Sequence, residues 1–164
     1  MKQFLTLNDL PDFDAQVALA QHIKANPYEF EQLGKRKTLG LLFFNPSLRT
    51  RLSTQKAARL LGMDVMVMNF SNEAWAIEYE DATIMEGLRS EHVKEAAQVV
   101  SQYCDVVGIR AFATLTNKEK DESEQVLQKF IEYSSVPILN MESATAHPLQ
   151  AFADALTLTE HDLP

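Results

Sequence analysis

Cysteine, basic residues and long apolar runs are scarce in this sequence, and each shortage excludes a class of protein. Cys104 is the one cysteine among 164 residues, so no disulfide can form within the chain and a reducing, cytoplasmic compartment is expected. Lysine and arginine number 15 against 23 aspartates and glutamates, which argues against general nucleic-acid binding because that needs a basic surface. No apolar run approaches the roughly 20 residues of a membrane helix. We therefore expect neither nucleic acid nor a membrane as partner.

Spacings typical of metal ligands are also missing. The chain has four histidines, and none stands at a metal-ligand spacing from another histidine or from the cysteine. We therefore expect no metal and no cofactor.

The residues that are present predict one globular core built from alternating helices and strands. Segments with helical periodicity alternate with short apolar segments typical of buried strands. Helices are expected at residues 12–26, 48–61, 91–103, 118–133 and 148–160, and strands at residues 37–44, 63–70, 104–110 and 136–140. This alternation predicts an α/β fold with a parallel four-stranded sheet flanked by helices.

Ligands of such sheets bind just beyond the carboxyl ends of the strands. Residues 45–51, 110–112 and 142–150 are expected at that edge. Residues 71–90 have no clear period, and we interpret them as a long loop. Their tryptophan, Trp75, either covers a ligand or anchors the loop on the core.

The first edge segment places hydroxyls and a guanidinium at the expected start of a helix. Ser47 and Thr50 offer hydroxyls, and Arg49 offers a fork of N–H donors that fits a phosphate. Backbone N–H groups at a helix N-terminus attract anions as well. Taken alone, the segment is explained equally well by a phosphate site and by a serine cap with solvated arginines.

The last edge segment carries a histidine and a glutamine. Pro148 keeps His147 out of helical geometry and at the cap position. Gln150 follows three residues later, so the two side chains could bind the oxygen and the nitrogen of one small amide. Taken alone, the segment is explained more simply by a capping histidine and an exposed glutamine. Arg110 and Glu142 reach the same edge, where each could bind a ligand or serve a structural role.

These motifs, in this order, resemble the aspartate/ornithine carbamoyltransferase family. The family's Ser-x-Arg-Thr-Arg phosphate motif is similar to residues 47–51, and its His-Pro-x-Gln motif is similar to residues 147–150, with Arg110 between them. The segments FFNPSLRTRLSTQKAA, NEAWAIE, GIRAF and NMESATAHPLQAFADAL resemble the N-acylornithine branch. RLSTQKAA resembles the N-succinylornithine enzymes more than the N-acetylornithine enzymes.

The resemblance implies a carbamoyltransferase of arginine biosynthesis. It would move the carbamoyl group of carbamoyl phosphate to the side-chain amine of N-succinyl-L-ornithine or N-acetyl-L-ornithine, giving N-acylcitrulline and phosphate. By the same resemblance, Arg110 and His147 are catalytic through the carbamoyl oxygen. The other residues implied to bind carbamoyl phosphate are Ser47, Leu48, Arg49, Thr50, Gln150 and Trp75, with Trp75 reaching a neighbouring subunit of a homotrimer.

Two further residues are implied to contact the acylornithine, namely Glu142 and Ser90. Ser90 stands in GLRSEH, where the N-succinylornithine enzymes have proline and the N-acetylornithine enzymes have glutamate. A glutamate there would repel a succinyl carboxylate, and a serine does not. The sequence therefore favours a succinyl group.

The resemblance covers only the first half of the family's length. It predicts a carbamoyl-phosphate-binding domain at residues 1–147 and an interdomain helix at residues 148–164, with the amino-acid-binding domain absent. Such a chain is expected to be catalytically incomplete by itself. The alternatives are an ornithine carbamoyltransferase, a non-catalytic carbamoyl-phosphate-binding half domain and an assembly domain without a ligand.

Overall fold

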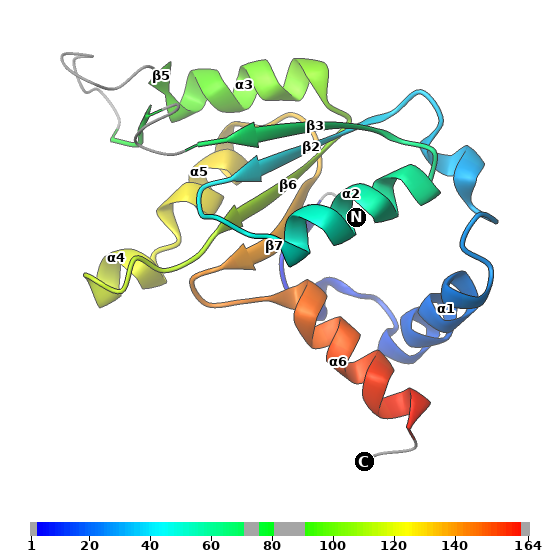
Figure 1. Ribbon diagram of the computed structural model, residues 1–164. Helices are drawn as coiled ribbons and strands as arrows, with labels where there is room; N and C mark the ends of the chain where they lie inside the picture. The colour runs from blue at the N-terminus through cyan, green and yellow to red at the C-terminus, as the bar shows by residue number, and fades with distance from the viewer. Residues whose placement is uncertain (1–2, 71–75, 81–90, 162–164) are drawn as a thin grey trace.

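A computed structural model describes residues 3–70, 76–80 and 91–161, which form a three-layer α/β arrangement (Figure 1). A parallel sheet forms the central layer and helices cover both of its faces. The α-helices in these residues are α1 (Phe13–Ala25), α2 (Arg49–Leu60), α3 (Val93–Tyr103), α4 (Lys118–Glu122), α5 (Gln125–Tyr133) and α6 (Pro148–Glu160). None of these described helices has the length and apolar character needed to cross a bilayer. The predicted α/β class is confirmed.

The central sheet has five strands, one more than the sequence predicts. Its order is β1-β7-β6-β2-β3, and every neighbouring pair is parallel. The strands are β1 (Gln3–Phe4), β2 (Thr38–Phe43), β3 (Asp64–Asn69), β6 (Val106–Ala111) and β7 (Ile138–Ser143). β1 could not be predicted from the sequence, because two residues are too few to show a period. The strand forms by pairing with β7.

A second, two-stranded sheet pairs β4 (Ile77–Glu78) with β5 (Glu91–His92). The prediction of a long loop over residues 71–90 is therefore wrong at residues 77–78, where β4 lies. Residues 71–75 and 81–90 are outside the described residues. The cause is the same as for β1, because so short a strand depends on a partner 14 residues away rather than on its own pattern.

Two apolar clusters hold the helices on opposite faces of the sheet. On one face, α3 and α5 pack on β6 through a cluster that includes the fully buried Val93 and Phe130. On the other face, Ala58 of α2 and Leu149 of α6 join a smaller cluster around Leu41 and Met141. β2 is buried on both faces, which explains its nearly continuous apolar sequence.

The strand order creates a crevice between β2 and β6. From β2 the chain passes through α2 to β3 on one side, and it then returns through α3 to β6 on the other side. Because α2 and α3 cover opposite faces, the carboxyl ends of β2 and β6 open between them, which is where ligands of such sheets bind. Figure 1 shows the carboxyl ends of β2 and β6 side by side. Residues 45–50 follow β2 and Arg110 lies near the end of β6, so both lie at this edge of the sheet.

The single helix predicted over residues 118–133 is in fact two helices. Glu124 interrupts it with a φ of 49°, a left-handed conformation that costs a non-glycine residue roughly 1–2 kcal/mol. The Glu124 carboxylate accepts hydrogen bonds from the hydroxyl and the backbone N–H of Thr145, at 2.7 and 3.0 Å. This contact spans 21 residues, so local periodicity could not reveal it.

β7 begins and ends later than the predicted strand over residues 136–140. Pro137 has no N–H to donate to a ladder, so the strand starts after it. It continues to Ser143 partly because the amide of Asn140 donates to the backbone oxygen of Leu5 and to Ser143 Oγ, both at 3.1 Å. Glu142 therefore lies on the strand rather than after it.

Asp121 anchors the loop between β6 and α4, and this predicts a local sensitivity to acid. Its carboxylate accepts hydrogen bonds from the backbone N–H of Thr114, the Thr114 hydroxyl and the backbone N–H of Leu115, at 2.8–2.9 Å. The backbone bond from Thr114 is the main cause of a pKa below the ordinary 3.8. A lowered pKa means that the stabilisation is present above pH 3.8 and is lost as the pH falls further.

We expect the Thr114 and Leu115 amides to lose hydrogen-exchange protection between pH 6 and pH 2, after correction for intrinsic rates. The Lys120 amide is a matched control, because it donates to the neutral side-chain oxygen of Asn117 at 3.0 Å and has no titrating partner there. Equal loss of protection at Lys120 would show general unfolding instead of a local effect of Asp121.

Candidate anion-binding site

A cavity of about 630 Å³ opens at the crevice between α2, β6, β7 and α6. Ten of its twelve lining residues come from the three edge segments that the sequence singled out, and the other two are Ser53 and Ala153. The lining residues are Pro46, Ser47, Leu48, Arg49, Thr50, Ser53, Arg110, Glu142, His147, Leu149, Gln150 and Ala153. Eight of the ten predicted site residues are in this set; the other two, Trp75 and Ser90, lie outside the described residues.

The start of α2 supplies hydroxyls and backbone donors to the cavity. The first turn of a helix leaves backbone N–H groups without intrahelical partners, and α2 begins at Arg49. Ser47 Oγ accepts one of them, from Thr50, at 3.3 Å. The N-cap residue of α2 is Leu48, which makes no side-chain cap bond, so the predicted serine cap differs from the structure. Ser47 lies one residue earlier, where it accepts this N–H and also lines the cavity.

The two arginines of this segment have different environments. Arg49 is exposed and lines the cavity. Arg51 is outside the lining: its Nη2 donates to Asn69 Oδ1 at 2.7 Å, and its guanidinium lies 4.2 Å from the centre of the Phe43 ring. Arg49 is thus the member of the pair that an anion in the cavity can reach.

Arg110 is buried, with 8% of its surface exposed, and it connects the segment after β2 with β7 in the cavity wall. Its Nη1 donates to the backbone oxygens of Asn45 and Pro46 at 3.2 and 2.9 Å, and its Nη2 pairs with Glu142 Oε2 at 2.8 Å. A guanidinium has five N–H donors, so these three contacts do not use all of them. Nε has no hydrogen-bond partner among the described residues.

A β-bulge places Glu142 beside Arg110. Ile109 pairs with Asn140, whereas the next residue, Arg110, pairs with Glu142, so β7 carries one extra residue, Met141. Such an insertion changes the direction in which the following side chains point. The Arg110 guanidinium and the Glu142 carboxylate are thereby brought into contact, an arrangement that no sequence pattern indicated.

His147 caps α6 and presents its other ring nitrogen to the cavity side. Nδ1 accepts from the backbone N–H of Gln150 at 3.3 Å, so in the neutral ring the proton is on Nε2. That Nε2 lies 3.6 Å from Glu142 Oε2, which is too long for a good hydrogen bond. An Nε2–H donor therefore remains available next to Arg110.

Two residues that matter to this geometry were missed by the sequence analysis. Asn45 Oδ1 accepts from the backbone N–H of Phe112 at 2.9 Å and joins the end of β2 to the end of β6. Asp154 Oδ1 accepts from Gln150 Nε2 at 2.7 Å. The four-residue spacing of Gln150 and Asp154 on one helix could have indicated their contact. No local sequence pattern indicates the contact between Asn45 and Phe112, which are 67 residues apart.

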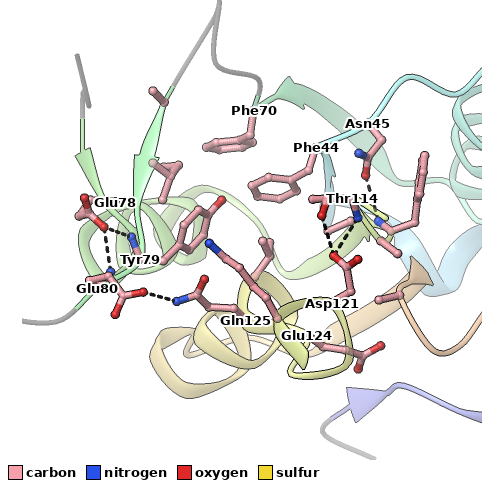
Figure 2. Close-up of a pocket in the computed structure, with 18 residues that line it drawn as sticks. Phe44, Asn45, Phe70, Glu78, Tyr79, Glu80, Thr114, Asp121, Glu124 and Gln125 are labelled. Atoms are coloured by element: carbon pink, nitrogen blue, oxygen red, sulfur yellow. Dashed lines mark hydrogen bonds between the residues drawn. The ribbon is translucent and has the colours of Figure 1, made fainter. Parts of the chain in front are cut away.

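A second cavity, of about 570 Å³, lies on the other side of the segment that follows β2 (Figure 2). Figure 2 shows the aromatic rings of Phe44, Phe70 and Tyr79 on its wall. The charged side chains of its described lining are Glu78, Glu80, Lys120, Asp121 and Glu124. An excess of carboxylates disfavours an anion, so the charge of the two linings favours the first cavity as the candidate anion-binding site.

The fold and this cavity define an α/β domain with a cavity rich in hydrogen-bond donors at the edge of a parallel sheet, between two helix N-termini. The sequence pattern of one known domain, the carbamoyl-phosphate-binding domain of aspartate/ornithine carbamoyltransferases, matches residues 2–160. The chain therefore belongs to the aspartate/ornithine carbamoyltransferase family.

Among individual relatives, the chain is similar to carbamoyltransferases that are named for N-acylated ornithines. The chain is 46% identical to an N-succinylornithine carbamoyltransferase of Bacteroides thetaiotaomicron, over 98% of this chain and 51% of that protein. It is 41% identical to an N-acetylornithine carbamoyltransferase of Xanthomonas campestris, over 98% of this chain and 47% of that protein. The chain thus spans about half the length of the curated relatives that it matches.

A solved structure shares both the fold and much of the sequence. It is a crystal structure of an N-acetyl-L-ornithine transcarbamylase variant, with glutamate replaced by serine, complexed with carbamyl phosphate and N-succinyl-L-norvaline. Its TM-score is 0.89 at 41% identity, over 98% of this chain and 48% of that one. Another structure of such an enzyme, complexed with acetylcitrulline, has the same TM-score at 40% identity and the same coverage.

Proposed function

We propose that the first cavity binds carbamoyl phosphate, and that the protein contributes this site to carbamoyl transfer onto the side-chain amine of an N-acylornithine. The observation that carries the proposal is the meeting of the α2 N-terminus, Arg110, His147 and Gln150 around one cavity. The family to which the chain belongs and the ligands named for its solved relatives support the same function.

Each part of carbamoyl phosphate has a chemically suited partner in this cavity. The phosphate would occupy the N-terminus of α2, with Ser47, Arg49, Thr50 and the backbone N–H of Leu48 as donors. The carbonyl oxygen would accept from Arg110 and from His147 Nε2–H. The carbamoyl NH₂ group would donate to Gln150. The tautomer of His147 with its proton on Nε2, which leaves Nδ1 to accept from Gln150, suits this role.

Transfer proceeds by attack of the uncharged amine on the carbonyl carbon. A C–N bond forms and the C–O bond to phosphate breaks, while the departing phosphate accepts the proton that the amine releases. Negative charge grows on the carbonyl oxygen during the attack, and Arg110 and His147 are placed to stabilise it. Holding the two reactants in this geometry would supply much of the remaining rate enhancement.

For the acceptor, we propose N-succinyl-L-ornithine, with N-acetyl-L-ornithine as the second candidate. The higher identity to N-succinylornithine enzymes supports this order. The complex of a serine-substituted N-acetylornithine enzyme with a succinyl analogue agrees with the expectation that Ser90 tolerates a succinyl carboxylate. Glu142 is proposed to meet the acceptor from the Arg110 side of the cavity.

The proposal includes the wider arrangement that the resemblance implies. Residues 1–147 form the carbamoyl-phosphate-binding domain, α6 belongs to a segment that leads to an amino-acid-binding domain, and Trp75 reaches the site of a neighbouring subunit in a cytoplasmic homotrimer. Equilibrium sedimentation tests the trimer. A half domain that binds carbamoyl phosphate without turnover is the second candidate; the cavity residues that support it all lie within this chain.

Calorimetric titration with freshly dissolved carbamoyl phosphate tests the binding site. We expect saturable binding that Arg49→Ala weakens at least tenfold, about 1.4 kcal/mol. Arg59→Ala is the matched control, because Arg59 is an exposed arginine near the opposite end of α2. Folded chain that does not bind, or equal losses in the two variants, would contradict a phosphate site at the start of α2.

Turnover by the protein joined to its amino-acid-binding half tests the acceptor. Citrulline-type products are measured side by side with free ornithine, N-acetylornithine and N-succinylornithine. We expect the highest kcat/KM with N-succinylornithine. Preference for free ornithine would replace the proposal with an ornithine carbamoyltransferase.

A further inference from the structure

We infer that Asp154 is a positioning residue, which fixes the orientation of the Gln150 carboxamide and thereby selects a carbamoyl group over an acetyl group. This inference rests on the proposed function, because it concerns the partner of the carbamoyl NH₂ group. Asp154 itself is outside the residues that line the cavity, whereas Gln150 is among them.

The contact joins two side chains on consecutive turns of α6. Gln150 Nε2 donates to Asp154 Oδ1 at 2.7 Å, and residues four apart on a helix are neighbours on its surface. The backbone N–H of Gln150 is held in turn by His147 Nδ1 at 3.3 Å. The glutamine is therefore fixed at its backbone by the capping histidine and at its side chain by the aspartate.

The chemistry of a carboxylate decides which way the carboxamide faces. An ionised aspartate only accepts hydrogen bonds, so the atom facing it must be the nitrogen of the glutamine. The carboxamide is planar, with its oxygen on the edge opposite Asp154, and this oxygen is left for a ligand. An oxygen can accept from the carbamoyl NH₂ group, whereas an acetyl methyl group offers it no donor.

The negative charge of Asp154, taken by itself, would lower the affinity for carbamoyl phosphate, whereas the orientation that Asp154 gives to Gln150 would raise it. A carboxylate beside an anion-binding cavity weakens every anion by repulsion, with no preference for carbamoyl phosphate over acetyl phosphate. The ratio of the two affinities therefore isolates the orientation of Gln150. A merely structural role of Asp154 would leave that ratio unchanged.

Calorimetry with carbamoyl phosphate, acetyl phosphate and inorganic phosphate tests the inference on the whole chain. We expect Asp154→Ala to reduce the preference for carbamoyl over acetyl phosphate by about three- to tenfold, the value of one hydrogen bond. Its affinity for inorganic phosphate should stay equal or rise. Asp154→Asn removes the same charge and keeps an oxygen that can accept from Gln150, so its preference should fall less.

Thr157→Ala controls for the loss of a side-chain contact on α6, because among the described residues the Thr157 hydroxyl bonds within the helix, to the Ala153 oxygen at 2.8 Å. An unchanged preference in Asp154→Ala, with carbamoyl phosphate still bound by the parent chain, would overturn the inference and leave the proposed function intact. A parent chain that binds inorganic phosphate but not carbamoyl phosphate would overturn the proposed function, and this inference with it.

Discussion

Replacing Arg110 by methionine is expected to weaken carbamoyl phosphate binding by at least about a hundredfold, which is about 2.7 kcal/mol. The guanidinium is the donor proposed for the carbonyl oxygen, and a hydrogen bond from a charged group contributes about 1.5–3 kcal/mol. Its removal also leaves the Glu142 carboxylate beside the cavity without its partner at 2.8 Å. Calorimetry on the folded variant gives the loss directly.

The same substitution should lower the free energy of unfolding by about 3 kcal/mol, at the low end of the range for breaking a buried ion pair, because the Glu142 side chain keeps 25% exposure. Arg110→Met combined with Glu142→Gln separates the two effects. We expect the double variant to recover much of the stability, but only the part of the affinity that is lost to the unpaired Glu142 carboxylate. Full recovery of binding in the double variant would mean that Arg110 only neutralises Glu142.

Replacing Phe130 by alanine is expected to cost about 3–5 kcal/mol of stability, the usual result for truncating a buried phenylalanine. Its ring has no exposed surface and meets Phe44 and Phe70 edge to face, at centroid distances of 5.9 and 6.3 Å. Such a loss is a large part of the about 5–15 kcal/mol that holds a domain together. Urea unfolding measures it.

Phe152→Ala is the matched control for this experiment. Phe152 is only half-buried on α6 and meets Phe13 at 5.8 Å, so we expect a loss of about 1 kcal/mol. Equal losses in the two variants would contradict a core centred on Phe130. Phe44 immediately precedes the segment that carries Ser47 and Arg49, so this core reaches the start of that segment.

Much of the fold could be predicted because the information is local. The apolar run of β2 and the helical period of α3 identify their own elements, and the alternation of such elements indicates a parallel sheet. The site followed from one further rule, that ligands bind at the carboxyl edge of the strands. That rule alone predicts that Ser47, Arg110 and His147 lie near one another.

The features that were missed depend on contacts between distant parts of the chain. Glu124 adopts a left-handed conformation while bonding to Thr145 across 21 residues. The bulge at Met141 exists in the pairing of β7 with β6, and it decides that Glu142 meets Arg110. Neither feature leaves a period or a motif in the sequence, because each depends on two segments that are distant along the chain.

Binding and helix capping also proved to be compatible interpretations of the same residues. Ser47 and His147 each accept a backbone N–H near the start of a helix, as a cap does, and each lines the cavity. The two interpretations share a physical origin, because the unpaired N–H groups that a cap satisfies also attract an anion. A sequence that signals a cap at the edge of a parallel sheet therefore gives no reason to exclude a binding role.

The most direct test of the central claim is to map carbamoyl phosphate onto the chain by NMR. In a titration of ¹⁵N-labelled protein, we predict saturable shifts in the backbone amides of Leu48, Arg49 and Thr50 and in the side-chain amide of Gln150. The resonances of backbone amides around the cavity of Figure 2, such as that of Thr114, should not shift. Shifts confined to that second cavity, or no shifts in a folded chain, would contradict the account.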